Sequence, residues 1–102
     1  MTYLMLLLAG ALLCNCVPHL VSGVQGAWFP TPFAKPRGVG ESSPLLNFIW
    51  GASNLLVGLF IVWRRLIVIG PNLQIAALAV GFLASGTFLA TYFGKVRKVA
   101  NG

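Results

Sequence analysis

Three long apolar runs constrain this chain more than any other feature. They are TYLMLLLAGALLCNCVPHLVSGV from Thr2, LLNFIWGASNLLVGLFIVW from Leu45 and NLQIAALAVGFLASGTFLATYFG from Asn72. Each reaches the roughly 20 residues that an α-helix needs to cross about 30 Å of hydrocarbon. Charged residues make up 8% of the chain, whereas soluble domains carry about 25%. The sequence therefore predicts an all-α integral membrane protein, a single membrane domain with three transmembrane helices.

The helix limits follow from the residues that interrupt these runs. Ser42 or Ser43 can cap the second helix, Pro44 suits its first turn, and Asn72 can cap the third. The Gly-Pro pair at 70–71 favours a tight turn, which predicts that the second and third helices are antiparallel neighbours. The predicted segments are a helix over about 2–21, a loop over 25–44, a helix over about 44–69, a helix over about 72–94 and a basic tail over 95–102.

The first run lies where a signal peptide would lie, so its flanks matter. No Lys or Arg precedes it, and no small-x-small cleavage site ends it. We therefore expect a retained helix. Pro18 lacks the N–H that would bond to the Cys14 carbonyl, which predicts a bend near the end of this helix.

Basic residues account for the net charge of +6, and they cluster at the predicted membrane edges. Such clusters suit anionic lipid headgroups, each cation contributing about 1 kcal/mol near the surface. They form no basic groove with interleaved aromatic residues, so we expect no nucleic-acid partner. The clusters are Lys35 and Arg37, then Arg64 and Arg65, then Lys95, Arg97 and Lys98.

The distribution of these cations also predicts an orientation. Five lie on the side shared by the first loop and the C-terminus, two lie in the second turn, and none lies in the N-terminal segment. The positive-inside rule then places the N-terminus outside and the C-terminus in the cytoplasm, as expected for a bacterial inner membrane. If Arg64 and Arg65 dominate, the orientation is reversed.

One face of the second helix combines asparagines with glycines. Asn47, Gly51, Asn54 and Gly58 are spaced four, three and four apart. Small residues let another backbone approach, and asparagine in hydrocarbon needs a hydrogen-bond partner. This face is either a helix-packing seam or the polar lining of a cavity or pore.

The third helix carries two ridges of small residues on different faces. Two ridges allow contact with two neighbouring helices, and three helices alone leave much surface uncovered. We therefore expect a homo-oligomer or a larger host complex. The ridges are Ala77, Gly81 and Ser85, and Gly86, Ala90 and Gly94.

Polar residues on the first helix are expected at the same depth as those on the second. Asn15 and His19 are one helical turn apart, and the first two helices are antiparallel. We therefore predict a polar cluster of Asn15, His19, Asn47 and Asn54. His19, an ionisable residue at the membrane edge, has either a structural role or a ligand-binding or proton-carrying role.

Little in the sequence indicates catalysis or a bound cofactor. Glu41 is the only carboxylate side chain, so no acid and base pair exists within one chain. An enzyme is not expected, except as part of a site built across several subunits. Cys14, Cys16 and His19 are a weak metal candidate, because an α-helix places the two thiols about 200° apart. No cofactor is predicted.

The segment WFPTPFAKPRG at 28–38 joins the first two helices. Its aromatic residues favour the headgroup boundary, its cations reach phosphates, and its prolines stiffen it. It is either an interfacial anchor or a lid over Asn15 and His19, with Glu41 pairing with a loop cation or facing His19. The anchoring side chains would be Trp28, Phe29, Phe33, Lys35 and Arg37.

Two functions remain compatible with these features. The preferred hypothesis is a small membrane protein that acts by helix packing, as a homo-oligomer or an accessory subunit. The alternative is a small oligomeric channel or carrier with a pathway lined by Asn15, His19, Asn47 and Asn54.

Overall fold

The computed structural model describes residues 1–37, 39–66 and 71–101, and it confirms the all-α class. Three helices dominate: α1 (Thr2–Val24), α2 (Pro44–Arg65) and α3 (Leu73–Asn101). All three are long and apolar enough to cross a bilayer, so the chain is an integral membrane protein. Two short strands, β1 (Phe29–Pro30) and β2 (Glu41–Ser42), lie in the connection between α1 and α2.

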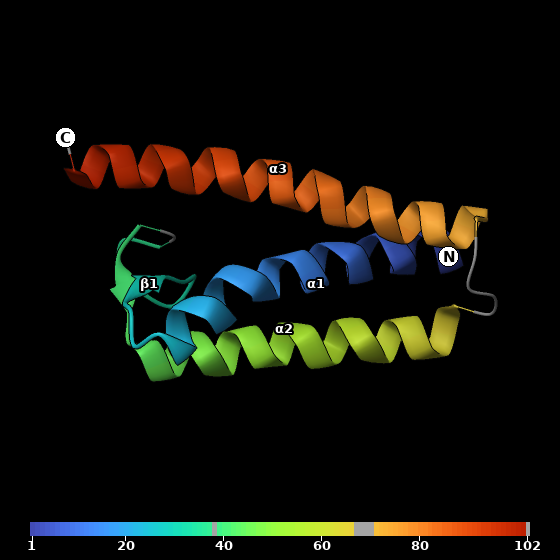
Figure 1. The fold of residues 1–102 in the computed structure, drawn as a ribbon, viewed down its shortest axis with the longest axis horizontal. Coiled ribbons are helices and arrows are strands. Elements are labelled where there is room, and N and C mark those ends of the chain that lie inside the picture. The colour runs from blue at the N-terminus through green and yellow to red at the C-terminus, as the bar shows by residue number, and fades with distance from the viewer. Residues whose placement is uncertain (38, 67–70, 102) are drawn as a thin grey trace.

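Helix α1 lies between the other two helices (Figure 1). It packs against both α2 and α3, whereas α2 and α3 hardly touch each other. They are antiparallel, but the expectation that they pack as neighbours is wrong. A short connection brings two helix ends together without requiring their faces to meet, and here the small-residue faces of both helices are turned to α1.

Two helix limits differ from the sequence-based ones. Helix α1 contains Pro18 and continues to Val24, because losing one backbone hydrogen bond does not end the helix. Helix α3 runs on to Asn101, so the predicted basic tail is helical. Gly94 costs the helix only about 1 kcal/mol relative to alanine, and helix-forming residues follow it.

The end of α2 is defined by a change in backbone geometry. The helix ends at Arg65, and Leu66 is extended with φ −87° and ψ 112°. The predicted helical residues 67–69 and Gly70 of the predicted turn lie outside the described residues. Within them, Asn72 caps α3 by accepting a hydrogen bond from the Ile75 N–H at 3.0 Å.

The start of α2 combines a cap with a proline. The Ser43 hydroxyl accepts from the Leu46 N–H at 3.2 Å, and Pro44 occupies the first helical position, where no N–H is needed. The cap is therefore Ser43, and Ser42 has a different role in β2.

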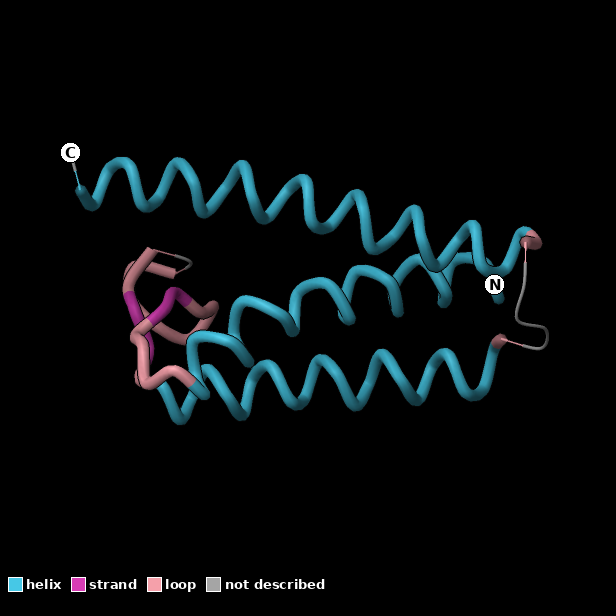
Figure 2. Tube along the Cα trace, in the orientation of Figure 1, coloured by secondary structure: helices cyan, strands magenta, loops and turns pink. Residues whose placement is uncertain are grey.

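The connection between α1 and α2 folds back on itself as a small antiparallel pair (Figure 2). Phe29 lies opposite Ser42, and Pro30 lies opposite Glu41. The Thr31 and Ser42 hydroxyls share a buried hydrogen bond of 2.6 Å. This connection and the C-terminal end of α3 lie at one end of the bundle, and the N-terminus lies at the other (Figure 1).

Candidate functional site

The four predicted polar residues meet at the α1–α2 interface in two hydrogen-bonded pairs. His19 Nδ1 lies 2.8 Å from Asn47 Oδ1, with both residues buried. Asn15 Nδ2 donates to Asn54 Oδ1 at 3.1 Å. We call this set of Asn15, His19, Asn47 and Asn54 the polar clasp. It links α1 to α2 at two depths.

Asn47 is the centre of the clasp and is fully buried. Its Nδ2 lies 3.0 Å from the Phe29 carbonyl oxygen and 3.1 Å from those of Ser42 and Ser43. Because these carbonyls can only accept, they orient the amide with its oxygen toward His19. His19 Nδ1 must therefore carry the hydrogen and donate it. One side chain thus connects α1, α2 and both strands.

Asn54 lies two helical turns farther from the loop than Asn47 and also links α2 to α1, with fewer hydrogen-bond partners. Its Nδ2 donates to the Trp50 carbonyl at 2.8 Å, which turns its oxygen toward Asn15. Asn54 is 3% exposed. An asparagine amide in hydrocarbon is costly without partners, and here its own helix and α1 supply them.

Aromatic side chains cover the loop-side end of the clasp. The Phe29 ring lies edge-on to the His19 ring with centroids 5.5 Å apart, and Phe29 is buried. The centroid of the Trp50 ring lies 6.5 Å from that of the His19 ring, and the centroids of the Phe33 and Trp50 rings are 5.0 Å apart. The structure therefore brings the loop over His19 through Phe29.

The other loop side chains are more exposed than Phe29. Trp28 and Phe33 are more than half exposed, and Lys35 and Arg37 are exposed as well. Glu41 is exposed, and among the described residues it pairs with neither of these cations nor with His19. The loop thus has a covering part at Phe29 and an exposed part suited to headgroups. The alternative in which Glu41 pairs with Lys35 or Arg37, or faces His19, is not the arrangement seen here, where Glu41 lies opposite Pro30 in the β1–β2 pair.

The two glycines on the clasp face of α2 let the helices approach closely. A Cβ at Gly51 would lie 2.8 Å from the Leu20 nitrogen of α1. At Gly58 it would lie 2.9 Å from the Leu13 side chain. The close approach allows the short asparagine side chains to reach across the interface.

The two small-residue ridges of α3 have different surroundings. On the first, Gly81 meets the Leu7 backbone of α1, and Ser85 donates to the Ala11 carbonyl at 3.3 Å. Ala77 is half-buried, near Tyr3 and Leu7. On the second ridge, a Cβ at Gly86 would lie 3.2 Å from Cys14 Sγ, whereas one at Gly94 would meet nothing within 4 Å.

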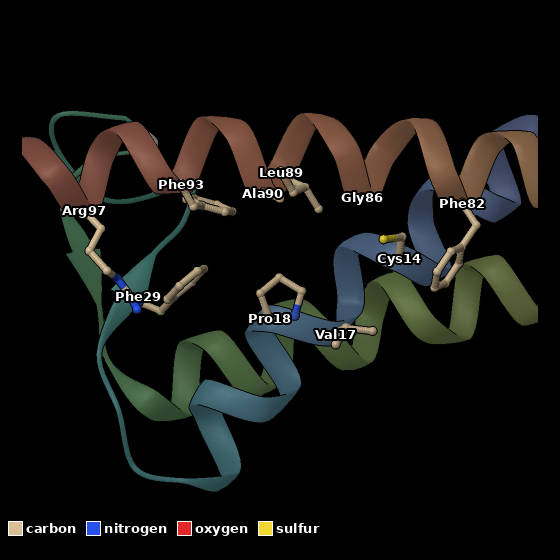
Figure 3. A pocket seen from close by; sticks show the side chains of 11 residues that line it. Cys14, Val17, Pro18, Phe29, Phe82, Gly86, Leu89, Ala90, Phe93 and Arg97 are labelled. Carbon is tan, nitrogen blue, oxygen red and sulfur yellow. The ribbon is translucent and has the colours of Figure 1, made fainter.

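The second ridge forms one wall of a groove of about 500 Å³ between α1 and α3 (Figure 3). Its walls are almost entirely apolar, and Arg97 lies at the loop-side end. Phe29 and Phe93 contact each other at that end, with ring centroids 4.8 Å apart. None of the four clasp residues lines it. The lining residues are Cys14, Val17, Pro18, Phe29, Phe82, Gly86, Leu89, Ala90, Phe93, Gly94 and Arg97.

The two cysteine side chains have different surroundings. Cys14 lines the groove, while the Cys16 thiol donates to the Leu13 carbonyl of its own helix at 2.9 Å. Both thiols are free. Within residues 1–37, 39–66 and 71–101, no group of three His, Cys, Asp or Glu side chains is arranged to hold a metal ion. The weak metal candidate formed with His19 therefore has no such geometry here.

The remaining cations are exposed at the two ends of the bundle. Arg64 lies 6.0 Å from the centroid of the Trp63 ring, a cation–π contact at the end opposite the loop. Arg65 is exposed beside it, and Lys95 and Lys98 are exposed near the C-terminal end of α3. These positions suit contact with lipid headgroups.

Comparison with protein-family models, with characterised proteins and with solved structures finds no match to this chain. Function is therefore argued from the chain's own geometry. Sequence reasoning missed the shared hydrogen bond of Thr31 and Ser42, and the burial of Phe29 against His19. The only signal available was the serine and threonine content near each end of the loop, and such residues are common in loops of every kind.

Proposed function

We propose that this protein acts by helix packing within the membrane, as a homo-oligomer or as an accessory subunit of a larger membrane complex. The observation that carries this proposal is the unequal burial of the three helices. Only 6% of the apolar span of α3 is buried within the chain, against 28% for α1 and for α2. The longest helix thus has the least contact with its own chain.

The surface offered to a partner is an exposed stripe of α3 that runs beside its contact with α1 and, in its first turns, borders Tyr3 and Leu7 of that helix. It combines small residues with hydroxyl groups, and all its members are exposed. Thr87 and Thr91 satisfy their hydroxyls on their own helix, at 2.9 Å from the carbonyls of Leu83 and Thr87. Such a surface lets another helix approach closely without burying an unsatisfied polar group. We call Ala76, Val80, Ala84, Thr87 and Thr91 the outer face of α3.

The closed polar clasp supports packing over the transport alternative. A pathway for ions or polar solutes needs side chains that are free to bind what passes. Asn47 and Asn54 instead use their amide groups on α1 and on backbone carbonyls. His19 is 2% exposed. The clasp is therefore suited to holding α1, α2 and the loop together.

Charge supports a finer proposal for membrane and orientation. The loop and the C-terminal end of α3 lie at the same end of the bundle (Figure 1), so Lys35, Arg37, Lys95, Arg97 and Lys98 gather there. We place that end in the cytoplasm of a bacterial inner membrane, with the N-terminus outside. Labelling of single cysteines introduced at Thr2 and Lys98, in a chain whose Cys14 and Cys16 are replaced by serine, tests this assignment in inverted and right-side-out vesicles.

The packing proposal is tested by native mass spectrometry of the tagged chain purified from host membranes, with Thr87→Leu as the variant. A bulky side chain on the outer face should release co-purifying subunits or dissolve the homo-oligomer. Ser53→Leu on α2 is the matched control, since Ser53 is also exposed and its hydroxyl also bonds to its own helix, at 2.8 Å. A chain that runs as a monomer with no partner, or loses its partner equally in both variants, contradicts the proposal.

A further inference from the structure

A second hollow continues the apolar groove at its loop-side end. It has a volume of about 450 Å³ and shares Phe29, Phe93 and Arg97 with the groove. Its other lining residues come from the loop, β1, β2 and the last turns of α3: Pro30, Val39, Gly40, Glu41 and Val96. The two spaces therefore adjoin where the Phe29 and Phe93 rings meet. We call the two together the path, which is apolar along the helices and more polar at the loop.

This polar end carries one charge of each sign. Glu41, the only acid of the chain, and Arg97 both line the second hollow. Within the described part of the chain, neither forms an ion pair with the other or with any third residue. Lys95 and Lys98 are not among the lining residues, because helical geometry turns them away from Arg97. The lining is thus electrically neutral overall, with its two charges apart.

The dimensions match one leaflet of a bilayer. Fifteen residues separate Phe82, at the deep end of the groove, from Arg97, which corresponds to about 22 Å along α3. One leaflet contributes about 15 Å of hydrocarbon and about 20–22 Å when its headgroup region is included. Trp28 and Phe33 are exposed in the loop, which lies at the same end of the bundle as the C-terminal end of α3, and aromatic side chains favour the headgroup boundary.

Figure 3 shows how these parts are arranged. Pro18 lies across the groove from Ala90 and Leu89, Cys14 and Phe82 lie at one end, and Phe29 and Phe93 lie toward the Arg97 side chain. An apolar chain fits between α1 and α3, and a headgroup fits where Arg97 and Glu41 line the second hollow.

We infer that this path binds a zwitterionic phospholipid with a primary ammonium group, of the phosphatidylethanolamine type. One acyl chain occupies the groove, Arg97 contacts the phosphate, and Glu41 accepts hydrogen bonds from the ammonium. Charge complementarity selects this occupant, because an anionic headgroup leaves Glu41 facing a further negative charge. A quaternary ammonium can approach Glu41 but cannot donate a hydrogen bond to it. The site lies on a different face of α3 from the outer face, so it does not depend on the proposed partner.

The test is a native mass spectrometry titration of the delipidated full chain with three lipids of identical acyl chains. Phosphatidylethanolamine should bind more tightly than phosphatidylglycerol by about fivefold, as expected for one added charge contact near the surface. The affinity for phosphatidylcholine should lie between those for the other two lipids. Equal binding of the three lipids by the natural chain overturns the inference.

Two charge variants separate the roles of the two residues. Glu41→Gln should remove the preference for phosphatidylethanolamine over phosphatidylglycerol while leaving binding of the latter intact or stronger. Arg97→Gln should weaken the binding of all three lipids to a similar extent, because each lipid has a phosphate. Both residues are exposed, so circular dichroism should show unchanged helicity. A preference that survives Glu41→Gln contradicts the assignment.

Two further variants test the groove and the location. Ala90→Trp places a bulky ring in the groove and should weaken the binding of every lipid. Arg65→Gln, at the opposite end of the bundle, should leave the binding of all three lipids unchanged. If Ala90→Trp instead leaves lipid binding unchanged and abolishes a homo-oligomer, the groove holds a second copy of this chain and the inference fails.

Discussion

Helix α1 has two interfaces built on different principles. Toward α2 it presents Asn15 and His19, which form hydrogen bonds with Asn54 and Asn47. Toward α3 it presents Gly10, at which a Cβ would collide with the Leu78 carbonyl of α3. Both interfaces bring two backbones close together, but the first adds paired side-chain hydrogen bonds between the helices, whereas the second depends mainly on the close approach itself.

The comparison shows which part of the helix arrangement each kind of contact determines. Paired amides have definite partners, so the polar clasp sets the depth of α2 relative to α1 and positions the loop. Small residues set only a distance of approach. Near Gly10 and Gly81, the backbones of α1 and α3 are in close contact. Farther along α3, at Gly86 and Ala90, the two helices are separated by the groove. We expect α3 to be the more separable helix.

The largest expected effect is that of Gly81→Leu. Any Cβ at this position meets the Leu7 carbonyl oxygen, so α3 must move away from α1. Overpacking of this kind costs about 1–3 kcal/mol, and we expect the upper end because the obstacle is backbone. The free energy of unfolding, measured by SDS titration in mixed micelles, gives the value.

Gly94→Ala is the matched control for this change. Gly94 lies on the same helix, and a Cβ there meets nothing within 4 Å. It should leave the free energy of unfolding unchanged or raise it by up to about 1 kcal/mol through helix propensity. Equal losses in the two variants would show that glycine is needed in α3 for a reason other than close contact.

Asn47→Ala should have the next largest effect, about 2 kcal/mol of unfolding free energy. It removes the acceptor for His19 and leaves the carbonyls of Phe29 and Ser42 without their amide donor. Because the loop loses its attachment, limited proteolysis should cut it faster in this variant. Tryptophan fluorescence during SDS titration and the rate of proteolysis are the two measurements.

Ser53→Ala is the control for the asparagine variant, since Ser53 lies on the exposed side of the same helix. It should change neither the unfolding free energy nor the rate of proteolysis. Loop protection that survives in Asn47→Ala would mean that the strand pairing of Phe29 with Ser42, and not the clasp, holds the loop.

Ser85→Ala should have the smallest effect, about 0.6 kcal/mol or less. Its bond to the Ala11 carbonyl is 3.3 Å long and joins α3 to α1. An alanine keeps the small size that the close approach requires. A loss equal to that of Asn47→Ala would show that the second interface also depends on hydrogen bonding, and would remove the contrast between the two.

The residues that sequence reasoning placed well share a physical property. Asn15, His19, Asn47 and Asn54 are polar groups in apolar runs, and hydrocarbon offers them no water. Their only favourable partners are each other and nearby carbonyls, and antiparallel helices bring them to matching depths. Their meeting was therefore predictable from spacing and polarity.

The residues that were placed poorly lacked such a constraint. Glu41 and Arg97 lie 56 positions apart in the chain, and nothing in the intervening pattern indicates that they line one hollow. Lys95, in the predicted tail, is helical, because a run of helix formers continues after Gly94. The pairing of Phe29 with Ser42 depends on where α1 and α2 hold the ends of the loop.

The sequence by itself determined the membrane class, the helix count and the polar face of each of the first two helices. Each of these depends on local composition and on a period of 3.6 residues, which hydrocarbon makes decisive because unsatisfied polar groups are costly there. Only the tertiary structure decided that α1 lies in the centre, that the loop docks through Phe29, and that α1 and α3 enclose a groove. Those features depend on which of several compatible helix faces meet, a choice made by packing distances that no single segment encodes.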